Sequence, residues 1–329
     1  MSDNRNRTLD ILKLFASYMV VFIHVMFYGK IGVAVDALAR FAVPLFFVVS
    51  GFYSYEISLK QIKKRVAHTL QLIAFAAAVY ILWNVLQLLI EQDTQGLVQY
   101  LNSYLSIKNL LKLLVFNIPL FTVHLWYLFA LLYVYVFYYF AVFFSIRKRL
   151  VFSMSILLLV LHVLLGEGLS IFKIAIPIPL VRNFALMGIP FFGLGLLANT
   201  YKQKLCNTPN YMINIFLMVG ILETVFSRYF FGKNELYIGS LFVLLACIVT
   251  FIKFPNIKYP SALISLTSCS TYIYIFHPLI SKLIKKLYPI INISFDSSVF
   301  LQMIHPILVC VLSTFWAYLL NKLSKQQKR

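Results

Sequence analysis

Acidic residues are scarce in this sequence: ten Asp and Glu stand among 329 residues, against 29 Lys and Arg. Charged residues of both signs make up only 12% of the chain, whereas 61% of it is hydrophobic. A water-soluble domain of this length needs much more polar surface, so the composition excludes that class of protein. We therefore expect a polytopic membrane protein that is surrounded by membrane lipid.

The placement of the basic residues and the small number of cysteines narrow the possible partners and sites. The net charge of +19 raises the question of nucleic acid, but the basic residues occur in short clusters between apolar runs. That pattern is typical of cytoplasmic loops, so we do not expect nucleic acid as a partner. The four cysteines are widely spaced and form no CxxC motif, which indicates neither a disulfide framework nor a metal site.

Apolar segments of membrane-spanning length recur along the whole chain. We place about ten of them near residues 8–28, 34–55, 68–90, 122–145, 150–166, 183–200, 211–231, 236–253, 261–280 and 299–321. The first segment lacks a small-residue cleavage site, so we interpret it as a retained helix and not as a signal peptide. No repeat or low-complexity linker divides the chain, which predicts one all-α integral-membrane domain over residues 1–329.

The basic residues predict the orientation of this bundle. With a cytoplasmic N-terminus, about 17 Lys and Arg lie on the cytoplasmic side and about 11 on the other. The positive-inside rule then places both termini in the cytoplasm, in agreement with an even number of spans.

The first apolar segment contains ionisable residues. In "LDILKLFASYMVVFIH", Lys13 and His24 are 11 positions apart and differ by only about 20° around a helix, while Asp10 and Ser17 lie within roughly 40° of the same line. Such a polar stripe favours the bundle interior or a water-filled cavity, with Asp10 and Lys13 able to pair. A polar seam that only stabilises the bundle is the alternative.

The predicted topology brings six ionisable residues to the depth of the outer leaflet. They come from six different segments and are His24, Arg40, His124, Arg182, Glu223 and His277. Each of them alone is readily explained as a satisfied polar residue, but six at one level favour a functional site.

Five motifs carry a resemblance to a known family. "LDILKLFASYMVVFIH", "RFAVPLFFVVSGFY", "HLWYLFALL", "RNFALMGIPFFGLG" and "STYIYIFHPLI" occur in an order and spacing similar to the membrane acyltransferase family 3. The resemblance covers nearly the whole chain. It implies a ten-helix bundle in a bacterial cytoplasmic membrane, acyl-CoA as donor with acetyl-CoA as the default, and a cell-surface glycan or lipid-linked sugar as acceptor on the far side.

The resemblance also assigns residues. The family's basic residue, ten intervening residues and histidine correspond to Lys13 and His24, although Arg is common at the first position. Its cytoplasmic Arg-x-x-Arg corresponds to Arg65 and His68 in "RVAH". Lys63 and Lys64 keep this loop basic, which makes the four residues candidates for the CoA phosphates. Ordinary positive-inside topology would explain the same loop.

Acyl transfer from a thioester to an alcohol requires a base for the hydroxyl proton and a group that stabilises the oxyanion. Histidine suits the first role, so we expect His24 as general base, with Lys13 and Arg40 stabilising charge or positioning the donor. We expect His124, Arg182, Glu223 and His277 on the acceptor side, and Glu223 and His277 are the candidates for orienting His24 or the acceptor. The sequence has no GxSxG elbow, which favours direct transfer, while Ser50 in "SGFY" stays open as a nucleophile.

Two other classes of protein are compatible with the sequence. A transporter or flippase of a small substrate such as an amino acid would use the same buried charges, although no inverted repeat is evident. A purely structural membrane protein would not require six ionisable residues at one depth. Dependence on acyl-CoA separates the first class from an acyltransferase.

Overall fold

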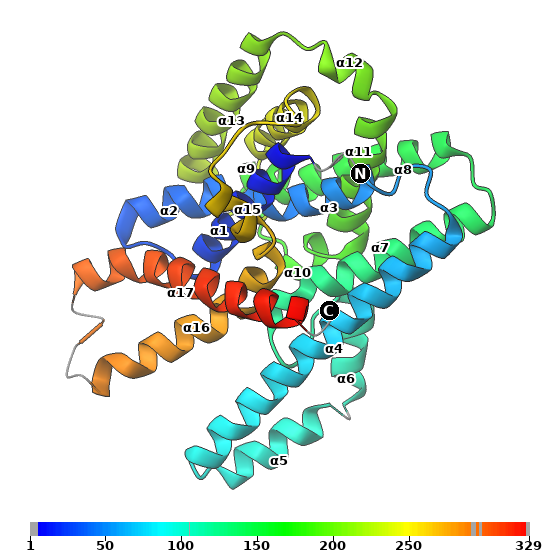
Figure 1. Ribbon diagram of the computed structural model, residues 1–329. Helices are drawn as coiled ribbons and strands as arrows, with labels where there is room; N and C mark the ends of the chain where they lie inside the picture. The colour runs from blue at the N-terminus through cyan, green and yellow to red at the C-terminus, as the bar shows by residue number, and fades with distance from the viewer. Residues whose placement is uncertain (1–5, 105, 291–293, 296–297, 327–329) are drawn as a thin grey trace. The chain divides into compact units, whose positions relative to one another are not determined.

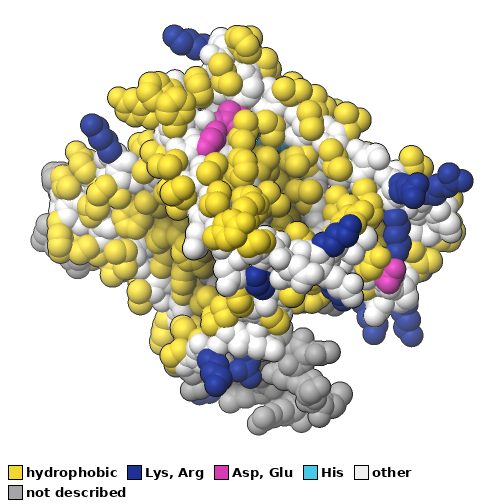
Figure 2. Space-filling model, turned by 90° about the horizontal axis from the view of Figure 1, so that it is seen from above, with side chains coloured by type: hydrophobic (Ala, Val, Ile, Leu, Met, Phe, Trp, Pro, Cys, Tyr) yellow, Lys and Arg dark blue, Asp and Glu magenta, His cyan; other side chains and the backbone are white. Residues whose placement is uncertain are grey.

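The computed structural model describes residues 6–104, 106–290, 294–295 and 298–326, and every regular element in these ranges is helical (Figure 1). The predicted all-α class is therefore confirmed for the described chain. Apolar side chains cover most of the face in Figure 2, and Lys and Arg side chains gather at its edges. A largely apolar exterior is what a bilayer requires of the protein that crosses it.

Within the described residues, six helices are long and apolar enough to cross a membrane. They are Gly29–Phe52, Leu59–Ile90, Val123–Phe143, Lys148–Ile171, Asn210–Phe231 and Val299–Leu323. The apolar helices Phe184–Thr200 and Ile238–Lys253 are shorter. Helical residues occur in each of the ten predicted segments, but the count of ten spans and the location of the termini stay predictions.

The described chain contains two amphipathic helices that lie outside the ten predicted segments. They are α5 (Thr94–Ser103) and α6 (Ile107–Phe116), between α4 (Leu59–Ile90) and α7 (Trp126–Phe143). Neither α5 nor α6 buries a residue, and Leu110, Leu111 and Leu114 on α6 are exposed. Both helices are too short to cross a bilayer, which is why a search for membrane-spanning length missed them.

The chain forms two compact units. The first comprises residues 1–46 and 201–329, and the second comprises residues 47–200, with one boundary inside α3 (Ala42–Phe52). The other helices of the first unit are α1 (Arg7–His24), α2 (Gly29–Leu38), α12 (Lys202–Cys206), α13 (Asn210–Phe231), α14 (Ile238–Lys253), α15 (Ser261–Thr267), α16 (Ser270–Ile290) and α17 (Val299–Gln326). The others of the second unit, besides α4 to α7, are α8 (Lys148–Val163), α9 (Leu169–Ile171), α10 (Ile178–Val181) and α11 (Ile189–Thr200).

Helix α1 is the central helix of the first unit, in contact with α2, α14, α15, α16 and α17. Its N-terminus is capped by the Asn6 side chain, which accepts a hydrogen bond from the Leu9 amide at 2.9 Å. The Asn6 amide group in turn donates to the Phe251 carbonyl at 2.7 Å, and Thr8 donates to that of Phe254. These contacts attach the start of α1 to the C-terminal end of α14.

Two glycines allow α3 and α11 to cross closely in the second unit. A Cβ on Gly51 would meet the carbonyl oxygen of Phe192, and a Cβ on Gly195 would meet that of Val48. Small residues at such crossings let helix backbones approach each other in membrane proteins. Gly51, in the motif "SGFY", provides this close approach.

We expect Gly51→Ala to destabilise the protein by about 1–3 kcal/mol, because the methyl group meets backbone that cannot rotate away. Thermal unfolding of purified protein in detergent measures the effect. Gly166→Ala is the matched control, since nothing lies within 4 Å of a Cβ at Gly166. Equal melting temperatures for the two variants would contradict the close crossing.

Candidate active site

Two histidines from different helices meet in the first unit. His24 ends α1 and is exposed, whereas His277 lies on α16 directly before Pro278 and is fully buried. Their ring centroids are 5.3 Å apart and the rings are tilted by 36°. The structure thus brings together the histidine of the first motif and that of "STYIYIFHPLI", which are 253 positions apart.

Helix α16 sets the orientation of the His277 ring. Nδ1 of His277 lies 3.1 Å from the carbonyl oxygen of Ile273, one turn earlier. Because a carbonyl only accepts hydrogen bonds, Nδ1 is the protonated nitrogen, and Nε2 is the acceptor side of the ring. A ring fixed in this way is suited to orient the neighbouring imidazole of His24.

Lys13 makes the ion pair that its spacing predicts. Its Nζ lies 2.7 Å from Oδ1 of Asp10, with side-chain exposures of 30% and 9%. Ser17 on the same stripe is buried and donates to the Leu14 carbonyl at 2.7 Å. Lys13 and His24 are separated by about 16 Å along the axis, at about 1.5 Å per residue. They therefore do not act on the same atom.

Arg40 lies in a buried cluster of charges. It belongs to the 3-10 segment Ala39–Phe41 that follows α2. Its guanidinium donates to Oδ1 of Asp36 at 2.6 Å and to Oε1 of Glu235 at 3.2 Å, and Lys233 Nζ lies 3.9 Å from the other oxygen of Asp36. The cluster joins the end of α2 to the connection between α13 and α14. Two carboxylates offset the charge of Arg40, so this geometry favours a structural role over oxyanion stabilisation, and its catalytic role stays a prediction.

Glu223 also uses its charge within the fold. Its Oε1 accepts from Ser227 at 2.7 Å, and its Oε2 accepts from the backbone amide of Gly239 at the start of α14. A carboxylate at a helix N-terminus is stabilised by the helix dipole and satisfies an amide that has no partner within the helix. Of the two residues that we considered as orienting His24, the structure places His277 beside it and assigns Glu223 to helix capping.

The second unit contains the other two predicted outer-level residues. His124 lies in the 3-10 segment Val123–Leu125 just before α7, and Arg182 directly follows α10. Nδ1 of His124 lies 2.6 Å from Oγ1 of Thr122, and its ring lies edge-on to Tyr80 with the centroids 5.2 Å apart. The guanidinium of Arg182 lies 5.7 Å from the centroid of the Trp126 ring, a distance that permits a cation–π interaction.

The predicted basic loop lies on α4 and divides into one half-buried anchor, Arg65, and three exposed side chains. The Arg65 guanidinium donates to the Tyr53 carbonyl at 2.6 Å, to Oγ of Ser54 at 2.8 Å and to the Ser50 carbonyl at 3.3 Å. It thereby caps the C-terminal end of α3, where carbonyls have no partner within the helix. Lys63, Lys64 and His68 are exposed on the first turns of α4 and are free to meet a ligand.

The comparison with known proteins identifies the family of this chain. The family model described as an acyltransferase domain, that of acyltransferase family 3, matches residues 6–322. The chain belongs to acyltransferase family 3. With its apolar helices, it is a membrane acyltransferase. Neither the curated proteins nor the solved structures gave a match.

The sequence analysis missed two polar groups of this acyltransferase. The first is the pair of carboxylates around Arg40; the spacing of Asp36 and Arg40, one helical turn apart, was the available signal. The second links α16 to α17: Nε2 of His305 lies 3.0 Å from Ser281 Oγ, and its Nδ1 lies 3.1 Å from the Tyr288 hydroxyl. No sequence pattern marked that group, because its three members are brought together only by the packing of the two helices.

The charge cluster predicts a large stability effect at Arg40. We expect Arg40→Gln to cost roughly 3–5 kcal/mol, because it leaves Asp36 and Glu235 buried without the guanidinium. Lys148→Gln is the control, since the Lys148–Glu56 pair is exposed and exposed pairs contribute little. Thermal unfolding in detergent measures both, and an Arg40→Gln variant as stable as the control would contradict the structural role.

Proposed function

We propose that this protein is an O-acyltransferase of a bacterial cytoplasmic membrane that moves an acetyl group from cytoplasmic acetyl-CoA to a sugar hydroxyl. The acceptor is a cell-surface polysaccharide or a lipid-linked sugar at the outer face, and both termini lie in the cytoplasm. The observation that carries the proposal is the contact between His24 and His277 in a chain of acyltransferase family 3.

His24 is the general base in this proposal. Its imidazole takes the proton of the acceptor hydroxyl as the oxygen attacks the thioester carbonyl, and the CoA thiolate then leaves and receives that proton. His277 touches His24 and limits the rotation of its ring, with Nδ1 held by the Ile273 carbonyl. It is therefore a positioning residue, and the transfer is direct, without an acyl-enzyme.

Lys13 contributes on the donor side. It lies about three turns from His24 toward the N-terminus of α1, which is the cytoplasmic end in the proposed topology. Its ammonium group stands beside Asp10 and remains partly exposed, so it attracts an anionic donor arm at a distance from the reacting atoms. The resemblance places Arg at this position in many members, and Lys keeps the charge while losing the planar fork.

The remaining residues divide between donor and acceptor. Lys63, Lys64 and His68 are exposed on α4 and form the phosphate-binding group, while Arg65 holds the loop that precedes it. His124, just before α7, and Arg182, just after α10, are assigned to the acceptor.

We expect His24→Ala to lower the rate of acyl transfer by about 10² to 10⁴-fold at saturating donor and acceptor, because that is the usual contribution of general acid–base catalysis. The assay uses purified protein in vesicles, radiolabelled acetyl-CoA and surface glycans isolated from a strain that lacks the gene. His305→Asn is the control, because it removes an imidazole from the same unit whose ring nitrogens bind Ser281 and Tyr288. A correctly folded His24→Ala variant with the parental rate would remove His24 from the mechanism.

Dependence on acyl-CoA tests the function itself. Mass spectrometry of surface glycans with and without the gene should show the loss of an acetyl-sized increment. Uptake or export of a small substrate by vesicles that contain the protein, without any acyl-CoA, would instead support transport.

Neutralising Lys63 and Lys64 together should raise the KM for acetyl-CoA, with a smaller difference at high salt, because screening weakens attraction between exposed charges. The turnover number should stay unchanged. The control is the pair Lys202→Gln and Lys204→Gln, which removes the same charge from exposed positions on α12. An unchanged KM in the Lys63/Lys64 variant would leave this loop with its topological role alone.

A further inference from the structure

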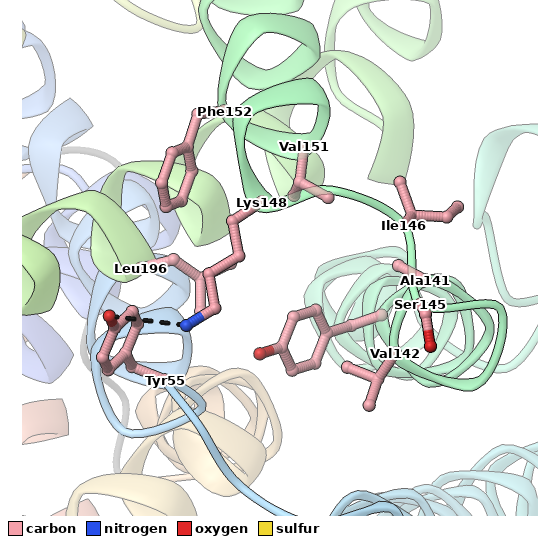
Figure 3. Close-up of a pocket in the computed structure, with 10 residues that line it drawn as sticks. Tyr55, Ala141, Val142, Ser145, Ile146, Lys148, Val151, Phe152 and Leu196 are labelled. Carbon is pink, nitrogen blue, oxygen red and sulfur yellow. Dashed lines mark hydrogen bonds between the residues drawn. The ribbon is translucent and has the colours of Figure 1, made fainter.

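A cavity of about 210 Å³ lies in the second unit, beside the connection between α7 and α8 (Figure 3). Three of its lining side chains are aromatic, namely Tyr55 from the segment after α3, Tyr138 from α7 and Phe152 from α8. Lys148, the first residue of α8, lines it as well. Sites that enclose a drug-sized ligand have volumes of roughly 300–1,000 Å³, so this cavity has room for one ring system of a larger molecule.

Lys148 places a cation at the cavity, and its ion pair with Glu56 can be exchanged for a pair with another anion. Its Nζ lies 2.8 Å from Glu56 Oε1 and 4.5 Å from the centroid of the Tyr55 ring, and Figure 3 shows it pointing toward the Tyr55 hydroxyl. The hydrogen bond from Lys148 lowers the pKa of the Glu56 carboxyl group. Because both members of the pair are more than half exposed, a more highly charged anion can replace Glu56 at little cost. Arg147 and Arg149 flank Lys148 and add positive charge.

The cavity is linked to the basic residues of α4 through Ser54. The Tyr138 hydroxyl donates to the Ser54 carbonyl at 2.8 Å, and Arg65 donates to the Ser54 hydroxyl at 2.8 Å. Lys63 Nζ lies 5.5 Å from the centroid of the Tyr139 ring, beside Tyr138 on α7. The exposed lysines of α4 and the aromatic cavity therefore lie at the same end of the second unit.

We propose that this cavity receives the adenine ring of the acyl-CoA donor, with Lys148 exchanging Glu56 for a donor phosphate. The proposal rests on the proposed function, in which acyl-CoA is the donor, and adds a nucleotide site to it. The flat aromatic side chains match a purine, which stacks on such surfaces irrespective of sequence-specific hydrogen bonds. Lys63 and Lys64 then contact the remaining phosphates, and the pantetheine arm extends out of the cavity.

The test compares a donor that carries the nucleotide with one that lacks both the nucleotide and the phosphate of the pantetheine arm. Acetyl-CoA carries the adenosine 3′,5′-bisphosphate portion, whereas S-acetyl-pantetheine lacks it. Val142→Trp fills the cavity from α7, and Phe152→Ala removes aromatic surface from α8. We expect each variant to raise the KM for acetyl-CoA about tenfold, on the scale of one lost stacking contact. The KM for S-acetyl-pantetheine and the turnover number should stay unchanged.

Matched controls come from the same segment of the chain. Phe144→Ala removes an exposed aromatic ring from the end of α7 that does not line the cavity. Arg149→Gln removes the same charge as Lys148→Gln from the same helical turn. We expect Lys148→Gln to raise the KM for acetyl-CoA more than Arg149→Gln does. Equal effects of the cavity variants and their controls, or equal effects on both donors, would overturn the proposal.

A binding measurement separates this proposal from the proposed function. Adenosine 3′,5′-bisphosphate should bind purified protein in detergent, and Val142→Trp should weaken that binding by about tenfold. If the donor is not acyl-CoA, neither thioester supports turnover of the unmodified protein and the bisphosphate does not bind. If acetyl-CoA is the donor but the cavity holds something else, turnover persists and Val142→Trp behaves as the unmodified protein does. Loss of a co-purified phospholipid in Val142→Trp, with its KM unchanged, would identify a lipid as the occupant and overturn the proposal.

Discussion

The low polarity of the bilayer interior is the constraint on which the rest of this structure depends. A charged side chain in that medium is costly unless it is paired, and every backbone amide and carbonyl must find a partner. Three of the described ionisable groups meet the first demand with partners inside the protein. Lys13 pairs with Asp10, Arg40 with Asp36 and Glu235, and Glu223 uses both carboxylate oxygens on Ser227 and the start of α14.

These pairings divide the ionisable residues into two groups with different consequences. The charge of Arg40 is offset within the fold, and the Glu223 carboxylate is engaged by protein donors, so both of them hold helices together. His24 differs, because its ring meets another imidazole and it is exposed. An exposed imidazole is suited to accept and release a proton. The same reasoning applies to the basic loop, where Arg65 is an anchor and Lys63 and Lys64 remain exposed.

Glycines bring helices together in the second unit, whereas paired charges connect helices in the first. Gly51 and Gly195 let α3 and α11 approach until each faces the backbone of the other, and Arg65 then caps the end of α3. The segment that follows α3 is held from a second side by Tyr138, which also lines the aromatic cavity. A short motif, "SGFY", thus connects helix packing, the basic loop and the cavity.

Several features of this acyltransferase are determined by the sequence alone. Hydropathy indicates helices that span a membrane, because the bilayer imposes its thickness on each segment independently. The 3.6-residue period places Asp10 and Lys13 within reach of each other, because both lie on one helix. The motifs identify the family, since they are read in chain order. Each of these inferences concerns one segment at a time.

Tertiary structure decided what depends on contacts between segments. His277 lies beside His24 although 253 positions separate them, and Glu235 joins Asp36 at Arg40 across 195 positions. The sequence analysis grouped Arg40 and Glu223 with His24 by their predicted depth in the membrane. Depth alone does not tell which partner each side chain contacts. The Ser281–His305–Tyr288 group and the cavity around Tyr55 had no signal at all in the sequence. Side-chain pairing between helices is set by how the helices pack, and the free energy of that packing is distributed over the whole bundle.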